Sequence, residues 1–398
     1  MTTPAKYPHL KFQKQWDLNR KCLLCFGESY ALVKAITNTY ILPNHYDKLL
    51  GIALNKGALS TTAIEGNTLS EEHIAKIKQG HKLPESIQYQ GIEVENMLDA
   101  FNVILNETVY QNDEQLITPA LLLRYHKLIG KNLKEHFDAT PGEFRDKNVS
   151  VGNYVGPLKE DVPELVDRYC EFLEREFQFK SGKEQDIEEF INTFIEAIVA
   201  HVYLEWIHPF GDGNGRTGRL IEFYILSRAG NPNITLHILS NHYNNTRPEY
   251  YRQLDKASKL ADLSDFIEYA IIGYRDGLIT ILETIQQSQK RITWQKYVYN
   301  KFDDVDITGQ KEVFKRKRSL GLEIPLDKHF SLEEIPDLSI TLARLYSNVS
   351  EKTLLRDVNE LVEMEILKED EDGIHYYANI ATINKMMPIR KNMLKASV

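Results

Sequence analysis

The sequence has little cysteine and no surplus of basic residues. Its three cysteines, Cys22, Cys25 and Cys170, are an odd number for a disulfide framework and predict a reducing compartment. Cys22 and Cys25 form a CxxC, but apolar residues surround them and no second pair follows at zinc spacing, so we interpret them as buried thiols. The formal net charge of −9 argues against broad binding to nucleic acid or acidic membranes.

Long hydrophobic runs are also missing. No uninterrupted run approaches the roughly 18 apolar residues of a membrane span, and the N-terminal residues contain no apolar signal-peptide core. We therefore expect a cytoplasmic protein with no membrane partner. With 42% hydrophobic and 26% charged residues, the chain can still bury a sizeable core, and its 398 residues predict two or three structural units.

Strand signals are scarce, and helical periodicity dominates. Apolar residues recur at helical spacing over 187–207 and over 262–287, and another helix is expected to begin near Arg216. The clearest strand signal is Val149–Val155, where alternating residues flank a Gly-Asn turn and predict a short hairpin. We therefore predict a mainly α fold with one small hairpin in its larger part.

The chain is expected to contain a helical N-terminal region, a larger core, a linker of mixed charge and a small C-terminal domain. These segments cover residues 1–112, 113–290, 291–330 and 331–398. Within the last segment we expect a helix over 340–349, a second over 350–366 that starts at a Ser cap, and a hairpin over 367–377. That order is typical of a winged helix.

Glycines, charged residues and a histidine meet in HPFGDGNGRTGR, which runs from His208 to Arg219. Its four glycines let the backbone approach a ligand closely, and the N–H groups of such a turn form an anion site with the next helix N-terminus. Arg216 and Arg219 add forked donors suited to phosphate oxygens. Asp212 offers Mg²⁺ an oxygen ligand, and His208 is suited to taking a proton from a hydroxyl. The segment predicts attack on a metal-bound polyphosphate.

Simpler interpretations of this segment are weaker. It contains no Walker sequence GxxxxGK[ST]. An EF-hand counted from Asp212 would have Thr217 where glycine is needed and Phe223 where glutamate is needed. A plain surface loop, in which His208 only ends a helix, does not account for a carboxylate, a histidine and two arginines in one short stretch.

The same segment matches every defined position of HPFxDGNGRxxR, the signature of the Fic family, and the chain resembles that family. The resemblance implies a Fic-type helical core with a hairpin flap, and an adenylyltransferase that moves AMP from MgATP to a Ser, Thr or Tyr hydroxyl of a target protein. It implies that His208 is the base, Asp212 the magnesium ligand and Arg219 the contact to the terminal phosphate. The other implied nucleotide contacts are Gly213, Asn214, Gly215, Arg216, Thr217 and Gly218.

The resemblance also implies roles outside the signature. The flap would consist of Val149, Ser150, Val151 and Gly152, and would pair with target backbone as an added strand. Downstream, the pattern NxRxxYY begins at Asn245, which would contact the nucleotide. Glu65, the inhibitory residue described next, would also lie in the nucleotide pocket. We interpret the two tyrosines of this pattern, Tyr250 and Tyr251, as half-buried packing residues.

A second motif, TTAIEG from Thr61 to Gly66, matches the family's inhibitory pattern [ST]xxxE[GN]. The resemblance implies that Glu65 pairs with Arg219 and blocks the terminal phosphate, so that the chain is autoinhibited. From the residues alone, Thr62 and Glu65 also have the spacing of a capping box at a helix start. Gly66 instead favours a helix end, where an anion needs a cation from elsewhere.

Two other functions stay open. Related enzymes with this glutamate also remove AMP from modified proteins, so a de-AMPylating hydrolase is one alternative. A winged-helix DNA-binding regulator is the other, supported by Lys352 and Arg356 on the second C-terminal helix. That helix also carries acidic residues, and the hairpin tip Glu369–Asp372 would repel phosphates. We therefore favour protein docking or dimerisation for this domain, with a homodimer as one outcome.

Overall fold

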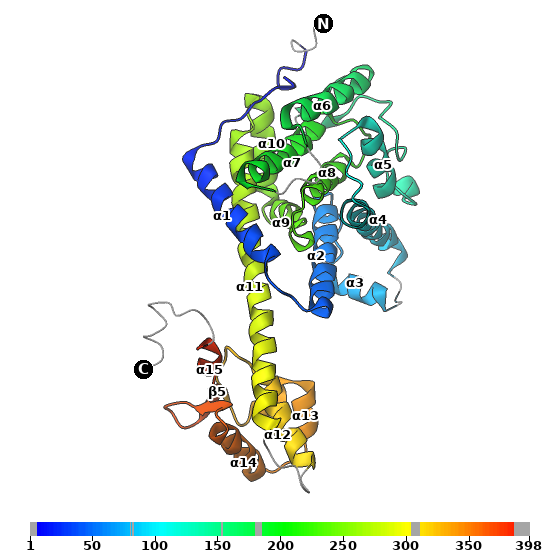
Figure 1. Ribbon diagram of the computed structural model, residues 1–398. Coiled ribbons are helices and arrows are strands. Elements are labelled where there is room, and N and C mark those ends of the chain that lie inside the picture. The colour runs from blue at the N-terminus through cyan, green and yellow to red at the C-terminus, as the bar shows by residue number, and fades with distance from the viewer. Residues whose placement is uncertain are drawn as a thin grey trace. The chain divides into compact units, whose positions relative to one another are not determined.

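The computed structural model describes residues 6–79, 81, 83–152, 154–179, 185–303 and 311–385. Over these residues the chain is mainly helical, as predicted, and it divides into two compact units (Figure 1). The first unit extends to Leu282 and the second begins at Glu283. The N-terminal region and the predicted core belong to the same unit, so the boundary expected near residue 112 does not separate compact bodies.

The first unit consists of helices, short helical turns and one hairpin. Its helices are α1 (Arg20–Thr37), α2 (Pro43–Ile64), α3 (Glu71–Lys78), α4 (Gln88–Leu105), α5 (Pro119–Ile129), α6 (Val162–Phe177), α7 (Ile187–Ile207), α8 (Asn214–Arg228), α9 (Ile238–Asn245), α10 (Arg247–Leu260) and the first part of α11 (Ser264–Asp303), which continues into the second unit. Its short turns are η1 (Glu85–Ile87), η2 (Asn106–Gln111), η3 (Lys134–His136), η4 (Lys159–Asp161) and η5 (Asn233–Thr235). The predicted hairpin is confirmed as β1 (Ser150–Val151) paired with β2 (Tyr154–Val155).

Helices α7 and α8 lie at the centre of this unit, packed against each other and contacted by α1, α2, α4, α5 and α6 (Figure 1). Among the described residues, α7 is the one helix long and apolar enough to cross a membrane, yet 83% of its most apolar stretch is buried in the unit. A helix that is covered on all sides is expected to be apolar all round. α7 has the predicted bounds, whereas α8 begins two residues before the predicted Arg216.

The three cysteines support the first unit as packing groups. Cys22, Cys25 and Cys170 are buried and form no disulfide, as expected from the sequence. Burial raises the pKa of the Cys22 thiol to about 12, so this thiol stays protonated at neutral pH.

The second unit has a three-stranded antiparallel sheet and several helices. Its remaining elements are α12 (Lys311–Glu323), β3 (Phe330–Ser331), η6 (Ile335–Leu338), α13 (Ile340–Tyr346), α14 (Glu351–Glu363), β4 (Leu367–Glu369), β5 (His375–Ala378) and α15 (Ala381–Asn384). The strand order is β3-β5-β4, with Phe330 opposite Tyr376 and Leu367 opposite Ala378. The predicted Ser cap is present, since the Ser350 side chain accepts from the Thr353 N–H at the start of α14. Helix, helix and hairpin follow in the order expected from the sequence.

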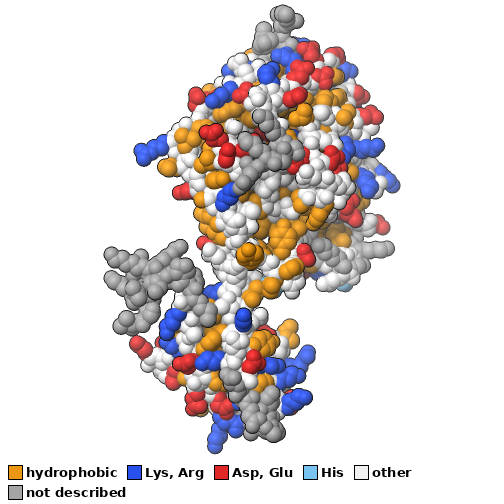
Figure 2. Space-filling view, viewed as in Figure 1, with side chains coloured by type: hydrophobic (Ala, Val, Ile, Leu, Met, Phe, Trp, Pro, Cys, Tyr) orange, Lys and Arg blue, Asp and Glu red, His pale blue; other side chains and the backbone are white. Residues whose placement is uncertain are grey.

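The linker predicted over 291–330 is wrong. α11 continues to Asp303, and its residues Trp294, Val298 and Phe302 join the core of the second unit. Within this segment of mixed charge, basic residues lie on α12 and pair with α14: Arg316 donates to Asp357 at 2.6 Å, and Lys317 contacts Glu360. Figure 2 shows Lys and Arg side chains as well as Asp and Glu side chains on the visible face of this unit.

Candidate active site

His208 ends helix α7 in a left-handed conformation. Its φ is 50°, and its N–H donates to the Leu204 carbonyl at 2.8 Å. A positive φ is uncommon outside glycine and costs about 1–3 kcal/mol, a strain frequent at functional sites. The ring Nδ1 lies 3.3 Å from the carbonyl oxygen of Glu205. Because a carbonyl only accepts, we assign the ring proton to Nδ1, which leaves Nε2 as a proton acceptor.

Arg145 fixes the His208 turn from outside the signature. Its Nε donates to the His208 carbonyl at 2.7 Å, while Nη1 and Nη2 donate to the carbonyls of Lys147 and Pro157. The last two carbonyls flank the hairpin, so one side chain connects the hairpin to His208. Nothing in the local sequence around Arg145 signals this role, because it depends on a loop and a helix end that meet only in the fold.

A cavity of about 180 Å³ lies beside His208 and brings together eight of the predicted site residues. Its wall combines the end of α2, the hairpin, the end of α7, the start of α8 and the start of α10. The residues that line it are Glu65, Val151, Glu205, His208, Gly211, Asp212, Gly213, Asn214, Gly215, Arg219, Tyr250 and Tyr251.

Two glycines and an asparagine shape the turn into α8. Gly213 has a φ of 82°, and a Cβ at this position would approach the Phe137 ring at 2.9 Å. A Cβ on Gly215 would collide with the Glu65 carboxylate. The Asn214 side chain closes the turn, since its Oδ1 accepts from the Phe210 N–H and its Nδ2 donates to the Phe210 carbonyl, both at 2.9 Å. The first N–H groups of α8, which lack intrahelical acceptors, can thus face an anion in the cavity.

Three other residues of the signature lie away from the described cavity wall. The Thr217 hydroxyl donates to the Gly213 carbonyl at 2.8 Å, and a Cβ on Gly218 would approach the buried His201 ring at 2.7 Å. Arg216 is bound by carboxylates at both ends of its guanidinium. In the structure these three residues hold α8 in place, and their contact with a nucleotide stays a prediction.

Arg219 meets the end of the inhibitory motif. α2 ends at Ile64, which places Glu65 at its C-cap and excludes the capping-box alternative. The Arg219 Nη2 donates to Glu65 Oε1 at 2.5 Å and to the Thr61 carbonyl at 3.0 Å, and its Nε donates to Thr61 Oγ1 at 2.7 Å. Burial raises the pKa of the Glu65 carboxyl, but the adjacent Arg219 charge and hydrogen bond outweigh it and leave that pKa below its usual value. Glu65 is therefore ionised at neutral pH and occupies the guanidinium.

Asp212 presents a partly exposed carboxylate at the mouth of the turn, with 32% of its side chain accessible. Mg²⁺ takes oxygen ligands and is usually held by one or two carboxylates together with substrate phosphates. In the part of the chain that the structure describes, no group of three His, Cys, Asp or Glu side chains could hold a metal ion. This donor set fits an ion shared between Asp212 and the phosphates of a nucleotide.

His126 supports Asp212 from helix α5 and was not foreseen from the sequence. Its ring stacks on Phe210 at 3.8 Å, its Nδ1 accepts from the Gly142 N–H, and its Nε2 lies 2.9 Å from the Asp212 carbonyl. Since Nδ1 accepts, Nε2 carries the proton and donates to Asp212. Burial lowers the pKa of His126 to about 4, so the neutral ring is maintained at physiological pH. A lone His in a helix gave no signal of this role.

The NxRxxYY pattern divides between the cavity and the surface. Asn245 is exposed at the end of α9 and is not among the described residues that line the cavity. Tyr250 and Tyr251 do line it, and Tyr250 is fully buried rather than half-buried. The Tyr250 hydroxyl lies 2.9 Å from His201 Nε2, and the Tyr251 hydroxyl donates to the Ile64 carbonyl at 3.2 Å. Both tyrosines thus help to position the α2 end and the α7 core around the cavity.

The hairpin borders the cavity through Val151. Val151 and Val155 are exposed by 49% and 75%, and Ser150 pairs with Val155. Two short exposed strands of this kind leave backbone N–H and C=O groups available to an added strand. The predicted flap residues Val149, Ser150, Val151 and Gly152 therefore stand where a target segment could reach the cavity.

Comparisons with known proteins agree with this geometry. The profile of the Fic/DOC family matches residues 116–226. The chain is 29% identical to protein adenylyltransferase Fic of Culex quinquefasciatus over 213 residues, and 31% identical to protein adenylyltransferase fic-1 of Caenorhabditis elegans over 210 residues. Each match covers 52% of this chain but only 38% and 37% of the relative, so the chain spans less than two fifths of these proteins.

Two solved structures show the same fold. A Fic family protein from Desulfovibrio desulfuricans G20 superposes with a TM-score of 0.54 and 19% identity, over 92% of this chain and 98% of that one. Fic-1 from C. elegans superposes with a TM-score of 0.52 and 25% identity, over 66% and 72% of the two chains. The segment that the family profile matches, 116–226, contains the complete signature, the turn into α8 and most of the cavity wall. Residues 116–226 of this chain therefore form a domain of the Fic/DOC family.

Proposed function

We propose that this chain is a protein adenylyltransferase that moves AMP from ATP to a hydroxyl side chain of a target protein. The observation that carries the proposal is the cavity in which His208, the Asp212 carboxylate, the N-terminus of α8 and Arg219 converge. Two curated relatives support it, since both are named protein adenylyltransferases. Mg²⁺ is the metal that the donor set favours.

The reaction follows from these groups. The target hydroxyl oxygen attacks the α-phosphorus of ATP, the bond between that phosphorus and the α–β bridging oxygen breaks, and pyrophosphate leaves. His208 Nε2 takes the hydroxyl proton as the new phosphodiester bond forms. The α8 N-terminus and Arg219 hold the phosphate oxygens, and Asp212 would hold Mg²⁺, which neutralises phosphate charge when bound. Exposed backbone of the hairpin would align the target segment.

The wild-type site is proposed to be autoinhibited. Arg219 is buried and already donates to Glu65 and Thr61, so the terminal phosphate must compete with an internal carboxylate for the same guanidinium. The competition is unequal while α2 keeps its place, because Glu65 is covalently linked and always at high effective concentration.

The test uses the Glu65→Gly variant and ATP radiolabelled at either the α- or the γ-phosphate. Label from the α-position should appear on protein, and His208→Ala in the same background should reduce it by roughly 100-fold or more, because general-base catalysis contributes about 10²–10⁴-fold. Circular dichroism checks that the His208 variant is folded. Transfer of the γ-label would replace AMP transfer with a kinase reaction, and persistent labelling without His208 would remove that residue as the base.

A second candidate is removal of AMP from a modified protein. Glu65 favours it, because 32% of its side chain is accessible and it lines the same cavity as His208, where a carboxylate can orient an attacking water. AMP released from a modified target by the wild type, but not by Glu65→Gly, would identify the hydrolase. Release by neither protein would leave transfer as the activity of this site.

For the C-terminal unit we propose protein docking rather than DNA binding. The basic run of α12 is partly neutralised by α14, where Arg316 and Lys317 contact Asp357 and Glu360. The tip of the β4–β5 hairpin carries Asp370 and Asp372, which bind His329 and His375 rather than offering positive charge. A duplex would meet repulsion at this tip. A salt-dependent mobility shift with a DNA duplex would contradict the docking role.

A further inference from the structure

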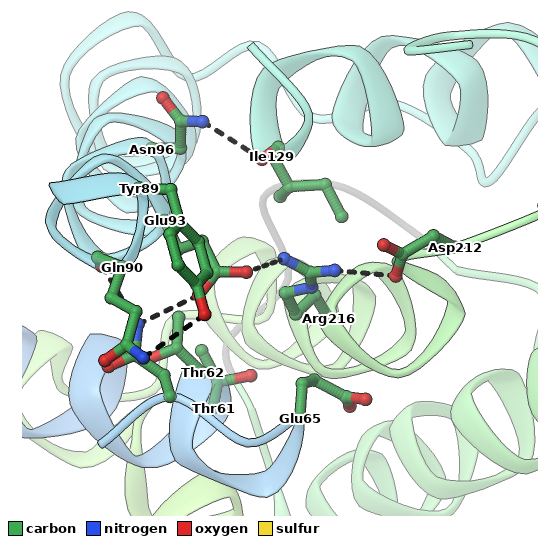
Figure 3. A network of polar contacts seen from close by, with 12 residues as sticks. Thr61, Thr62, Glu65, Tyr89, Gln90, Glu93, Asn96, Ile129, Asp212 and Arg216 are labelled. Atoms are coloured by element: carbon green, nitrogen blue, oxygen red, sulfur yellow. Dashed lines mark hydrogen bonds and ion pairs between the residues drawn. The ribbon is translucent and has the colours of Figure 1, made fainter. Parts of the chain in front are cut away.

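Glu93, on helix α4, binds two different parts of the site through its two carboxylate oxygens. Oε1 accepts from Arg216 Nη1 at 2.8 Å, and Oε2 accepts from Asn67 Nδ2 at 2.9 Å. Figure 3 shows Glu93 between the α2 end and Arg216, with Asp212 on the far side of the guanidinium. Only 11% of the Glu93 side chain is accessible, so these bonds form away from bulk water.

The first contact continues to the expected metal ligand. Arg216 Nη2 donates to Asp212 Oδ1 at 2.7 Å, so the guanidinium bridges two carboxylates that belong to different elements. The Arg216 side chain is 4% accessible and lies over the Phe137 ring, which restricts its position. Because the guanidinium is a rigid planar fork, fixing one end sets the direction of the other. The place of the Asp212 carboxylate thus depends on Glu93.

The second contact reaches the inhibitory segment. Asn67 follows Glu65 by two residues, and its Nδ2 also donates to the Gln90 carbonyl at 2.9 Å. The Asn67 N–H donates to the Thr62 carbonyl, which completes the end of α2. Next to it, the Thr68 N–H and hydroxyl both bond Gln90 Oε1 at 3.0 Å. Helix α4 therefore holds the chain directly after Glu65.

We propose that Glu93 is a positioning residue that sets the metal-ligand carboxylate of Asp212 through Arg216 and anchors the inhibitory segment through Asn67. This proposal rests on the proposed function, in which Asp212 binds Mg²⁺ with the nucleotide. The Glu93 carboxylate contacts both Arg216 and Asn67. Asp212 therefore keeps its orientation when Glu65 leaves Arg219, provided Glu93 remains in place. Binding of Mg²⁺-nucleotide and release of Glu65 are then separable events with one shared support.

A single substitution separates the two contacts. Glu93→Gln keeps the size of the side chain but replaces one carboxylate oxygen by an NH2 donor and removes the charge, so it cannot accept at both positions from Arg216 and Asn67. Asn67→Ala is the matched control, because it removes the second contact and leaves the Glu93–Arg216–Asp212 bridge intact. Both changes are made in the Glu65→Gly background, where Glu65 no longer competes for Arg219.

The measurement is ADP binding by calorimetry with Mg²⁺ and with chelator, so that the metal-dependent part of the affinity is obtained without turnover. Glu93→Gln should weaken that part roughly 10-fold or more, the range for residues that orient a metal ligand, and Asn67→Ala should leave it within about 2-fold. An unchanged value for Glu93→Gln, or an equal loss in both variants, would reduce Glu93 to a packing anchor and overturn the proposal.

A second variant covers loss of folding. If Glu93→Gln shows no cooperative melting transition, Arg216→Lys is used in its place. The lysine ammonium is a point charge that can pair with one carboxylate but cannot bridge both. It should show the same loss of metal-dependent affinity, and a retained affinity would overturn the proposal. The result is independent of AMP transfer: metal-dependent ADP binding that responds to Glu93 without any α-label transfer would refute the proposed reaction alone.

Discussion

Each unit of the molecule contains an arginine–carboxylate pair with one buried partner, and the two pairs differ in which partner faces solvent. In the first unit the Arg219 side chain is 1% accessible, while 32% of Glu65 is accessible in the cavity. In the second unit 14% of the Arg316 side chain is accessible, while its partner Asp357 is completely buried. The exposed partner decides what can replace it. In the proposed mechanism phosphate displaces Glu65 from Arg219, whereas Asp357 is closed to solvent.

The surroundings of the two carboxylates explain the difference. Asp357 accepts from Arg316 Nε and Nη2, at 2.6 and 3.2 Å, and from the Tyr346 hydroxyl at 3.2 Å. Among the described residues, the Glu65 side chain accepts a hydrogen bond from Arg219 only, at the end of a helix, where its charge is otherwise unfavourable. A buried pair with several partners stabilises one structure. A pair at a cavity wall, in which the carboxylate has a single partner among the described residues, suits a switch.

The largest effect is expected from Asp357→Ala. Removing one partner of a buried pair costs about 3–5 kcal/mol, because the other charge stays buried without compensation. Hydrogen exchange of α14 should accelerate accordingly, since this helix carries the substituted residue. The matched control is Glu360→Ala. Glu360 pairs with Lys317 and is more accessible than Asp357, so its removal should change the free energy of exchange by no more than about 1 kcal/mol. Equal effects of the two changes would erase the distinction between a core pair and a surface pair.

A smaller effect is expected from Glu65→Gly, and this change should raise activity rather than reduce stability. Labelling of protein from α-labelled ATP should rise roughly 5- to 150-fold, the range of about 1–3 kcal/mol typical of coupling between an inhibitory contact and a ligand. Hydrogen exchange of α2 and α8 should change little, because Arg219 keeps two hydrogen bonds to Thr61. Glu65→Gln, which keeps the shape and removes the charge, should give an intermediate rise. Unchanged labelling in both variants would make Glu65 a structural residue like Asp357.

Local sequence patterns predicted the elements that form the site, because these depend on near neighbours. The periodicity over 187–207 corresponds to α7, and the glycines before Arg216 correspond to the turn into α8. The end of α2 at Glu65 followed from the adjacent Gly66 and from the need of a C-terminal anion for a cation.

Contacts between distant segments could not be predicted in the same way. Glu93, His126 and Arg145 support the site through partners 63 to 123 residues away, and a single charged residue or histidine in a helix or loop has no local pattern that reveals them. The linker prediction failed for the same reason. A basic run suggests a solvated segment unless its acidic partners, here 41 and 43 residues further along, are known.

The smallest effect is expected from Thr61→Val, which tests how Arg219 is held toward Glu65. Thr61 is buried, and its hydroxyl accepts the Arg219 Nε–H, while its carbonyl accepts from Nη2. Valine keeps the branched shape and the carbonyl but removes one acceptor, at a cost of about 0.5–1.5 kcal/mol to the inhibited arrangement. Labelling should therefore rise roughly 2- to 10-fold, less than with Glu65→Gly.

The double variant decides whether Thr61 acts with Glu65 or separately. If both residues hold Arg219 in the inhibited orientation, Thr61→Val should add almost nothing once Glu65 is glycine, because the arrangement that it weakens no longer exists. A cycle of the four proteins, assayed with α-labelled ATP, measures this coupling. Independent, multiplicative effects would contradict a shared role. A fall in labelling in the Glu65→Gly background would assign the Thr61 hydroxyl to the active orientation of Arg219, and Glu65 would then be the exchangeable partner in a pair whose arginine stays fixed.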